Sequence, residues 1–453
     1  MLTLRQRPLN GDARIYTVDL DTIAQGWQRS TRAVGGYYSA GFNVNGISSV
    51  LMRDYFYNWI GRVVREETAG VTTWEGIVYK LSLIQDGVEH IISMEPDKFH
   101  NAVDVYYTDS AVVDANVGAM AYLVAQDRFQ DTGQDFTPWA GTDPAPYRIQ
   151  INNTNDTVTT AYIGHITSAP ANDTVAVYTN RGLTSQGWTG VDPAGLTAAN
   201  YQIIEVDAEN QRISAGLAED ANSQAEYGES QYFVTQSGAD STAAEALRDR
   251  HLAEFAYPRA RMVNQGDAEN TLVVTCAGLW FTSFWRYWTH SETGTASELI
   301  TSLTGDTEFL TAGRIDTNTL DVTCAAYDIP QRIGDLLERV VSQGDASGNL
   351  YNCGVYENRV LHYEQAPTTA AYYLDNGVLK NLGGQPVIPQ MIKPGFLVAT
   401  DLGSVLNPLA NTQSQATYVE QVEYFRDSGE LLLSLIDDSG SIITLQQQIA
   451  GNR

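Results

Sequence analysis

The chain is short of positive charge. Its 453 residues include 54 acidic side chains but only 27 basic ones, so the formal net charge at neutral pH is −27. Only four of the basic residues are lysines: Lys80, Lys98, Lys380 and Lys393. A surface that grips DNA needs many basic side chains against the phosphates, and this composition argues against one. The acidic excess favours solubility, or a surface along which DNA passes without being held.

Cysteine and long apolar runs are scarce too. Cys276, Cys324 and Cys353 lie far apart without a Cys-x-x-Cys pair, which argues against a zinc site or a disulfide framework and predicts buried thiols. No stretch reaches the roughly 18 to 20 apolar residues of a membrane span, and the first residues lack the apolar run of a signal peptide. We therefore expect a chain that starts in a cytoplasm and has no membrane-spanning segment.

The common signatures of catalysis and cofactor binding are missing. The six histidines, at positions 90, 100, 165, 251, 290 and 362, show no His-x-x-x-His or His-x-His spacing. The sequence has no Gly-x-Ser-x-Gly, no Gly-x-x-x-x-Gly-Lys and no Gly-x-Gly-x-x-Gly pattern. We therefore predict no catalytic residue, no metal ligand, no cofactor and no enzyme.

Some acidic residues could still form a catalytic pair or bind a metal ion. Asp54, Glu66, Glu67 and Glu75 could supply the carboxylate pair of a glycosidase, but we predict that they are solvated surface acids. The run from Asp345 to Asn349 lacks the later glutamate of a calcium loop and predicts a turn that ends a helix.

The six aromatic rings between Trp280 and Trp288 are the one candidate binding platform. Stacked tryptophan and tyrosine faces bind sugars, and they bind bases when basic residues accompany them, but only Arg286 lies among these rings. A buried core or a subunit contact is the favoured interpretation.

Alternating and β-branched residues predict strands over most of the chain, with a few helices between them. Turns at Thr68-Ala69-Gly70 and Gln85-Asp86-Gly87 predict an antiparallel meander. We predict helices from Ser48 or Ser49 to Trp59 with Leu51 on the apolar face, from Thr242 to about Phe255, from Thr295 to Leu303 and from Asp328 to the turn at Gly344, and mild helical character over Val112–Val124.

Two further stretches bear on the domain organisation. From Gly141 to about Asn222 the sequence is rich in Thr, Asn, Asp and Gly with short β-prone pieces, which favours an inserted β domain over a long loop. Near the C-terminus, Ala416–Phe425 carries apolar residues on both parities, which predicts one face against a core and the other against a partner.

Five short motifs, taken in order, resemble the tail-tip and baseplate hub proteins of tailed bacteriophages. Their order and spacing carry the resemblance, which covers most of the chain except about 111–222. The motifs are Tyr57-Asn-Trp-Ile-Gly-Arg62, Trp74-Glu-Gly-Ile-Val-Tyr79, Tyr227-Gly-Glu-Ser-Gln-Tyr232, Glu245–Glu254 with Tyr257-Pro-Arg259, and Lys393-Pro-Gly395.

The resemblance implies a mainly β (α+β) fold with two tail-tube-like β-barrels, helical and mixed connecting segments and an inserted β module. It also implies a homotrimer whose two barrels per subunit form a pseudo-sixfold ring. The domains expected are 1–110 (N-terminal barrel), 111–140 (connector), 141–222 (inserted β domain), 223–265 (return strand and helix), 266–365 (mixed α/β) and 366–453 (C-terminal barrel).

The function implied is that of a structural virion protein, assembled in the host cytoplasm. Such a ring closes the tail tube, contacts the tube or distal tail protein and the central fibre or receptor-binding protein, and guides DNA through its lumen without specific binding. The alternatives are a hexameric distal tail or adaptor protein, a carbohydrate-binding adhesin and, third, a polysaccharide depolymerase.

Overall fold

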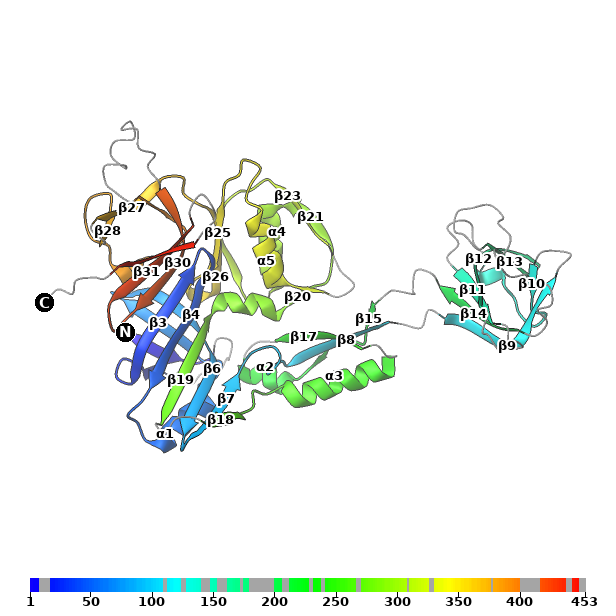
Figure 1. Ribbon diagram of the computed structural model, residues 1–453, viewed down its shortest axis with the longest axis horizontal. Helices are drawn as coiled ribbons and strands as arrows, with labels where there is room; N and C mark the ends of the chain where they lie inside the picture. Colours follow the sequence, from blue (N-terminus) through cyan, green and yellow to red (C-terminus); the bar gives the residue numbers. More distant parts are fainter. Residues whose placement is uncertain are drawn as a thin grey trace. The chain divides into compact units, whose positions relative to one another are not determined.

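The computed structural model describes the chain except for residues 8–16, 109–111, 124–127, 140–146, 153–160, 172–173, 179–198, 206–211, 228–230, 238–240, 266–269, 308, 326–329, 376–377, 400–415, 437–441 and 448–453. The described chain is mainly β, as predicted, and divides into two compact units (Figure 1). The first unit contains Met1–Asp104, Leu217–Val234 and Arg248–Arg453, and the second contains Val105–Gly216 and Thr235–Leu247.

The first unit is built on a curled sheet to which 18 of the described strands belong. Long strands β3, β4, β19 and β6 run side by side in it (Figure 1). The strands are β1 (Leu2–Arg5), β2 (Thr17–Asp19), β3 (Ala24–Arg32), β4 (Val34–Val44), β5 (Val63–Thr68), β6 (Val71–Gln85), β7 (Val88–Ser93), β18 (Arg261–Gln265), β19 (Thr271–Gly278), β22 (Thr311–Ile315), β25 (Tyr351–Val355), β26 (Val360–Gln365), β27 (Ala370–Asp375), β28 (Val378–Asn381), β29 (Leu397–Ala399), β30 (Ala416–Phe425), β31 (Glu430–Ile436) and β32 (Ile442–Gln447).

The predicted meander is confirmed as β5, β6 and β7, which pair antiparallel in that order. At the first turn Ala69 and Gly70 have φ of 51° and 78°, and at the second Asp86 and Gly87 have φ of 52° and 77°. Two successive residues with positive φ give the turn whose twist matches that of the strands it joins, and glycine at the second place adopts it freely.

Early and late strands share this sheet. β3 pairs with β4 on one side and with β30 on the other, and β4 also pairs with β25 in parallel. In the described part of this unit, the apolar residues nevertheless form two cores: a larger core between Leu2 and Tyr363, and a late core between Leu379 and Leu435. The early and late segments are therefore two packing modules, joined edge to edge by hydrogen bonds.

β30 packs one of its faces against a core, as expected. A register shift between Val419 and Gln421 reverses the parity of the strand, so that Val419, Val422 and Tyr424 are all buried in the late core. A bulge of this kind inserts one residue and re-aims the side chains beyond it. The opposite face carries both Glu423 and the apolar Phe425, and the expected contact with a partner stays a prediction.

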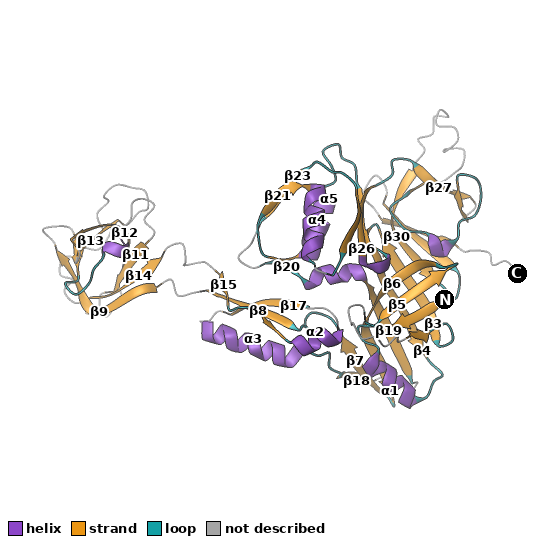
Figure 2. Cartoon of the chain, turned by 180° about the vertical axis from the view of Figure 1, so that it is seen from behind, coloured by secondary structure: helices purple, strands orange, loops and turns teal. Residues whose placement is uncertain are grey.

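The helices of the described chain are α1 (Ser49–Asn58), α2 (Ala221–Tyr227), α3 (Ser241–Phe255), α4 (Ala296–Asp306) and α5 (Ile333–Ser342), with 3-10 turns η1 (Thr137–Trp139), η2 (Leu279–Trp285), η3 (Glu357–Arg359) and η4 (Pro389–Met391). Figure 2 shows α4 and α5 side by side. None of them is long and apolar enough to cross a membrane.

The predicted starts of two helices are confirmed. Ser48 caps α1, as predicted, but Leu51 is exposed, and Met52 and Phe56 face the core instead. Thr295 caps α4, with Glu298 closing a capping box.

The start of α5 was predicted too early. The helix begins at Ile333 because β24 (Gln331–Arg332) pairs with β20 (Tyr287–Trp288), which uses the backbone groups that a longer helix would need. Asp328 lies outside the described residues. A second short pair joins β21 (Glu292–Thr295) to β23 (Asp321–Cys324).

The second unit contains a closed barrel in the order β10, β13, β12, β11, β14, β9. Its strands are β9 (Val112–Leu123), β10 (Arg128–Gln130), β11 (Tyr147–Asn152), β12 (Ala161–Ala171), β13 (Thr174–Tyr178) and β14 (Ala199–Glu205). The helical character expected over Val112–Val124 is wrong, because β9 is held in extended form by β10 on one side and β14 on the other. The segment 111–140, predicted as a connector, thus supplies two strands of the barrel.

A further small sheet contains β8 (Ala102–Thr108), β15 (Arg212–Ser214), β16 (Ala218–Glu219) and β17 (Tyr232–Ser237).

Candidate functional site

The acidic residues singled out in the sequence fall into two classes. Asp54 is exposed and Glu67 is half-buried, but Glu66 and Glu75 expose only 4% of their surface each. For these two the prediction of solvated surface acids is wrong. They lie on the paired strands β5 and β6.

Glu66 is the acceptor at the centre of a buried cluster. Its Oε1 accepts a hydrogen bond from Nε1 of Trp27 at 3.0 Å. Its Oε2 accepts from Nε of Arg29 at 2.6 Å and from Oγ1 of Thr73 at 2.8 Å. Because β3 and β5 are not paired with each other, the Arg29–Glu66 ion pair crosses the interior of the curled sheet.

Arg29 extends this cluster to the late segment. Its Nη2 donates to the backbone oxygen of Gln390, and Nε2 of Gln390 donates to Oη of Tyr424 at 2.8 Å. The guanidinium carbon lies 5.2 Å from the centroid of the Tyr424 ring. One buried charge pair therefore contacts both the early strands and the late ones.

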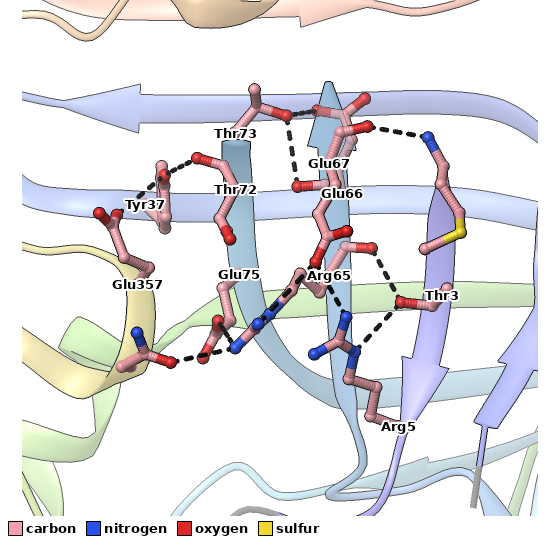
Figure 3. A network of polar contacts seen from close by, with 12 residues as sticks. Thr3, Arg5, Tyr37, Arg65, Glu66, Glu67, Thr72, Thr73, Glu75 and Glu357 are labelled. Carbon is pink, nitrogen blue, oxygen red and sulfur yellow. Dashed lines mark hydrogen bonds and ion pairs between the residues drawn. The ribbon is translucent and has the colours of Figure 1, made fainter. Parts of the chain in front are cut away.

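A second branch surrounds Arg65 (Figure 3). Its Nη2 lies 2.5 Å from Oε2 of Glu75 and donates to Oδ1 of Asn358 at 3.3 Å. Burial raises the pKa of Glu75 despite the lowering effect of Arg65. On the same strand, Glu67 accepts a hydrogen bond from Nη2 of Arg5 at 2.9 Å.

A third branch starts at Tyr37, which Figure 3 shows between Thr72 and Glu357. Its hydroxyl donates to the backbone oxygen of Thr72 at 2.8 Å and lies 3.5 Å from Oε2 of Glu357. Burial raises the pKa of Tyr37, so the phenol stays a donor. Nζ of Lys393 lies 3.6 Å from Glu357 and 4.3 Å from the ring centroid of Tyr356.

This network fits a structural junction better than a reacting centre. Both carboxylate oxygens of Glu66 accept hydrogen bonds from buried donors. Among the described residues, no group of three or more His, Cys, Asp or Glu side chains could hold a metal ion. The network fixes the early module to the segment that leads into the late module.

The other sequence features lie in the core or in turns. Trp280, Trp285 and Trp288 are buried, which confirms the core interpretation of these rings. The three cysteines are free and buried, as predicted. Asp345 accepts hydrogen bonds from the backbone N–H of Ser347 and Asn349, which confirms the turn after α5.

One surface hollow could not have been found from the sequence. It has a volume of about 610 Å³ and lies over the face of β3, β4, β19 and β30, strands that are up to 400 residues apart. Arg32 lies at its edge, with the guanidinium 3.6 Å from the Tyr38 ring centroid and Nε bonded to Oε1 of Gln421 at 3.0 Å. Small side chains such as Ser30 and Ser39 form its floor.

No protein-family model matches the chain, and no curated protein matches it.

Proposed function

We propose that the chain is a structural component of a phage tail tip, a hub-type subunit that forms a ring at the end of the tail tube. The ring connects the tube to receptor-binding or central-fibre parts and leaves a passage for DNA. Three such subunits, each contributing two β modules, make a ring of six modules.

The observation that carries the proposal is the double pairing of β3. This strand is hydrogen-bonded to β4 in the larger core and to β30 beside the late core, so one chain presents two β modules as a continuous sheet. A ring made of such subunits leaves few sheet edges exposed. The buried network at Arg29 and Glu66 supports the same role, since it holds the two modules in a fixed arrangement.

The charge of the chain supports the passage of DNA. A net charge of −27 makes the average surface repel phosphate, and a repulsive lumen lets a polyanion slide without adhering. Replacing acidic residues of the lumen with arginine is expected to slow DNA release from assembled particles, and the effect should fade as salt screens the charges.

The oligomeric state tests the ring. We expect the purified full-length chain to have a mass of about 149 kDa by native mass spectrometry, three times the 49.7 kDa of one chain. Six copies would favour the hexameric adaptor instead. A strictly monomeric chain at micromolar concentration, with no label at the tail end when particles are stained with a specific antibody, would contradict both.

A further inference from the structure

Two histidines of the first unit lie in an unusual aromatic environment. His100 is fully buried, and its ring stacks on Phe233 with centroids 4.4 Å apart and planes 12° apart. Phe255 approaches the same ring at 4.9 Å. Nδ1 of His100 lies 2.7 Å from the backbone oxygen of Pro96, which makes it the protonated nitrogen, and Nε2 is buried without a hydrogen-bond partner.

The second histidine comes from α3. The ring of His251 lies 5.6 Å from that of His100 and 5.1 Å from that of Phe233, and its Nδ1 is also buried without a partner. The backbone N–H of His100 donates to the oxygen of Phe255 at 3.0 Å, which ties the loop at His100 to the end of α3. We call His100, Phe233, His251 and Phe255 the aromatic latch.

The latch is close in sequence to three of the places where the chain passes between the two units. These places follow Asp104, Val234 and Leu247. His100 precedes the first by four residues, Phe233 stands one residue before the second, and His251 follows the third by four. The residues that fasten these segments to the first unit thus include both imidazoles.

The charges around the latch are few. Asp97, on the loop before His100, favours the protonated form of His100, and Glu254 on α3 does the same for His251. Arg250 on α3 opposes protonation of His251, and His251 opposes protonation of His100. Arg261 on β18 lies over the Phe255 ring at 5.6 Å. β17 contributes the apolar ring of Phe233, and no carboxylate accepts a hydrogen bond from either imidazole in the described part of the chain.

We propose that the aromatic latch is an acid-sensitive fastening: it holds the C-terminal half of α3 against β17 and the His100 loop at neutral pH, and protonation of the imidazoles releases it. A charged imidazolium is unfavourable among these apolar rings, because no acceptor lies beside either unpartnered nitrogen to take a hydrogen bond from the added proton.

The direction of the pH dependence follows from burial. Burial lowers the pKa of His100 to about 4, and it lowers the pKa of His251 as well. In the open state the imidazole recovers its ordinary pKa of about 6.5, so the open state binds a proton first. The closed latch is therefore stable above pH 6.5 and loses stability as the pH falls toward 4. For His100 alone, the opening equilibrium is expected to rise about 20-fold between pH 7 and pH 5.

Hydrogen exchange of the full-length chain tests this directly. After correction for the intrinsic effect of pH on exchange, protection of the His100 amide and of residues 248–255 should fall about 20-fold from pH 7 to pH 5. His100→Phe and His251→Phe keep a ring in each place. The first should flatten the pH dependence, and the second should leave the roughly 20-fold contribution of His100. His290→Gln, at an exposed histidine of the same unit, is the matched control and should leave the fall intact.

If His100→Phe does not fold, the imidazole signals of the wild-type chain decide the matter by NMR. The latch requires one histidine whose signals stay those of a neutral imidazole down to pH 5, while protection already falls between pH 7 and pH 5. Protection that is unchanged between pH 7 and pH 5, or a fall of the same size in His100→Phe as in wild type, would overturn the proposal.

Discussion

Replacing Glu66 with alanine is expected to destabilise the first unit by about 3 to 5 kcal/mol, because it leaves the guanidinium of Arg29 buried without its counter-ion. The side chains of Arg29 and Glu66 expose only 1% and 5% of their surface, so water cannot take the place of the lost carboxylate. Trp27 and Thr73 lose their acceptor at the same time. The measurement is the denaturant midpoint of the tryptophan fluorescence transition, since Trp27 and Trp74 lie in this unit.

Two further variants separate the charge effect from a general loss of packing. The double variant Arg29→Met with Glu66→Leu removes both charges and keeps apolar volume, so it should recover most of the lost stability. Glu67→Ala, the next residue on the strand, breaks a half-exposed pair with Arg5 and should cost no more than about 1 kcal/mol. Equal losses in Glu66→Ala and Glu67→Ala would show that the buried pair has no special role.

Local patterns were enough to predict most of the strands. The meander of β5, β6 and β7 was found because each turn has a glycine at the place that needs positive φ. β9 was missed because its extended form depends on β10 and β14, and β14 lies some 80 residues further along the chain. A segment with weak intrinsic preference adopts the structure that its neighbours in space impose.

The candidate site was beyond the reach of sequence reasoning for a similar reason. The sequence around Glu66 does not indicate its partners, because Arg29 lies 37 residues earlier in the chain and Gln390 some 320 residues later. Only the pairing of β3 with both β4 and β30 brings these groups together. The set of β30 residues that share one face could not be predicted for a different reason. The single bulge at Val419 leaves no trace in the alternation of residue types.

The distinction between a catalytic and a structural carboxylate also depends on this placement. A general acid or nucleophile must reach a substrate, and Glu66 has neither an exposed surface nor an unoccupied oxygen. Its three donors come from β3 and β6, so its role is to hold strands together.

Gly36→Ala is expected to separate β4 from β25 and to destabilise the first unit by about 3 to 5 kcal/mol, through backbone strain and a steric overlap that act together. Gly36 has φ of +73°, and an added Cβ would overlap with the backbone of Val355, its partner in the parallel ladder. Neither backbone can move away without breaking the β4–β25 hydrogen bonds that connect the early strands to β26 and beyond.

Gly26→Ala is the matched control for this prediction. Gly26 has φ of +67° on the neighbouring strand β3, but nothing lies within 4 Å of an added Cβ, so only the strain of the left-handed backbone remains, about 1 to 2 kcal/mol. The difference between the two variants in the denaturant midpoint thus measures the overlap with Val355 alone. If the two variants lose the same stability, β4 and β25 do not approach as closely as the pairing requires. β4 is then not held to β25 at this ladder.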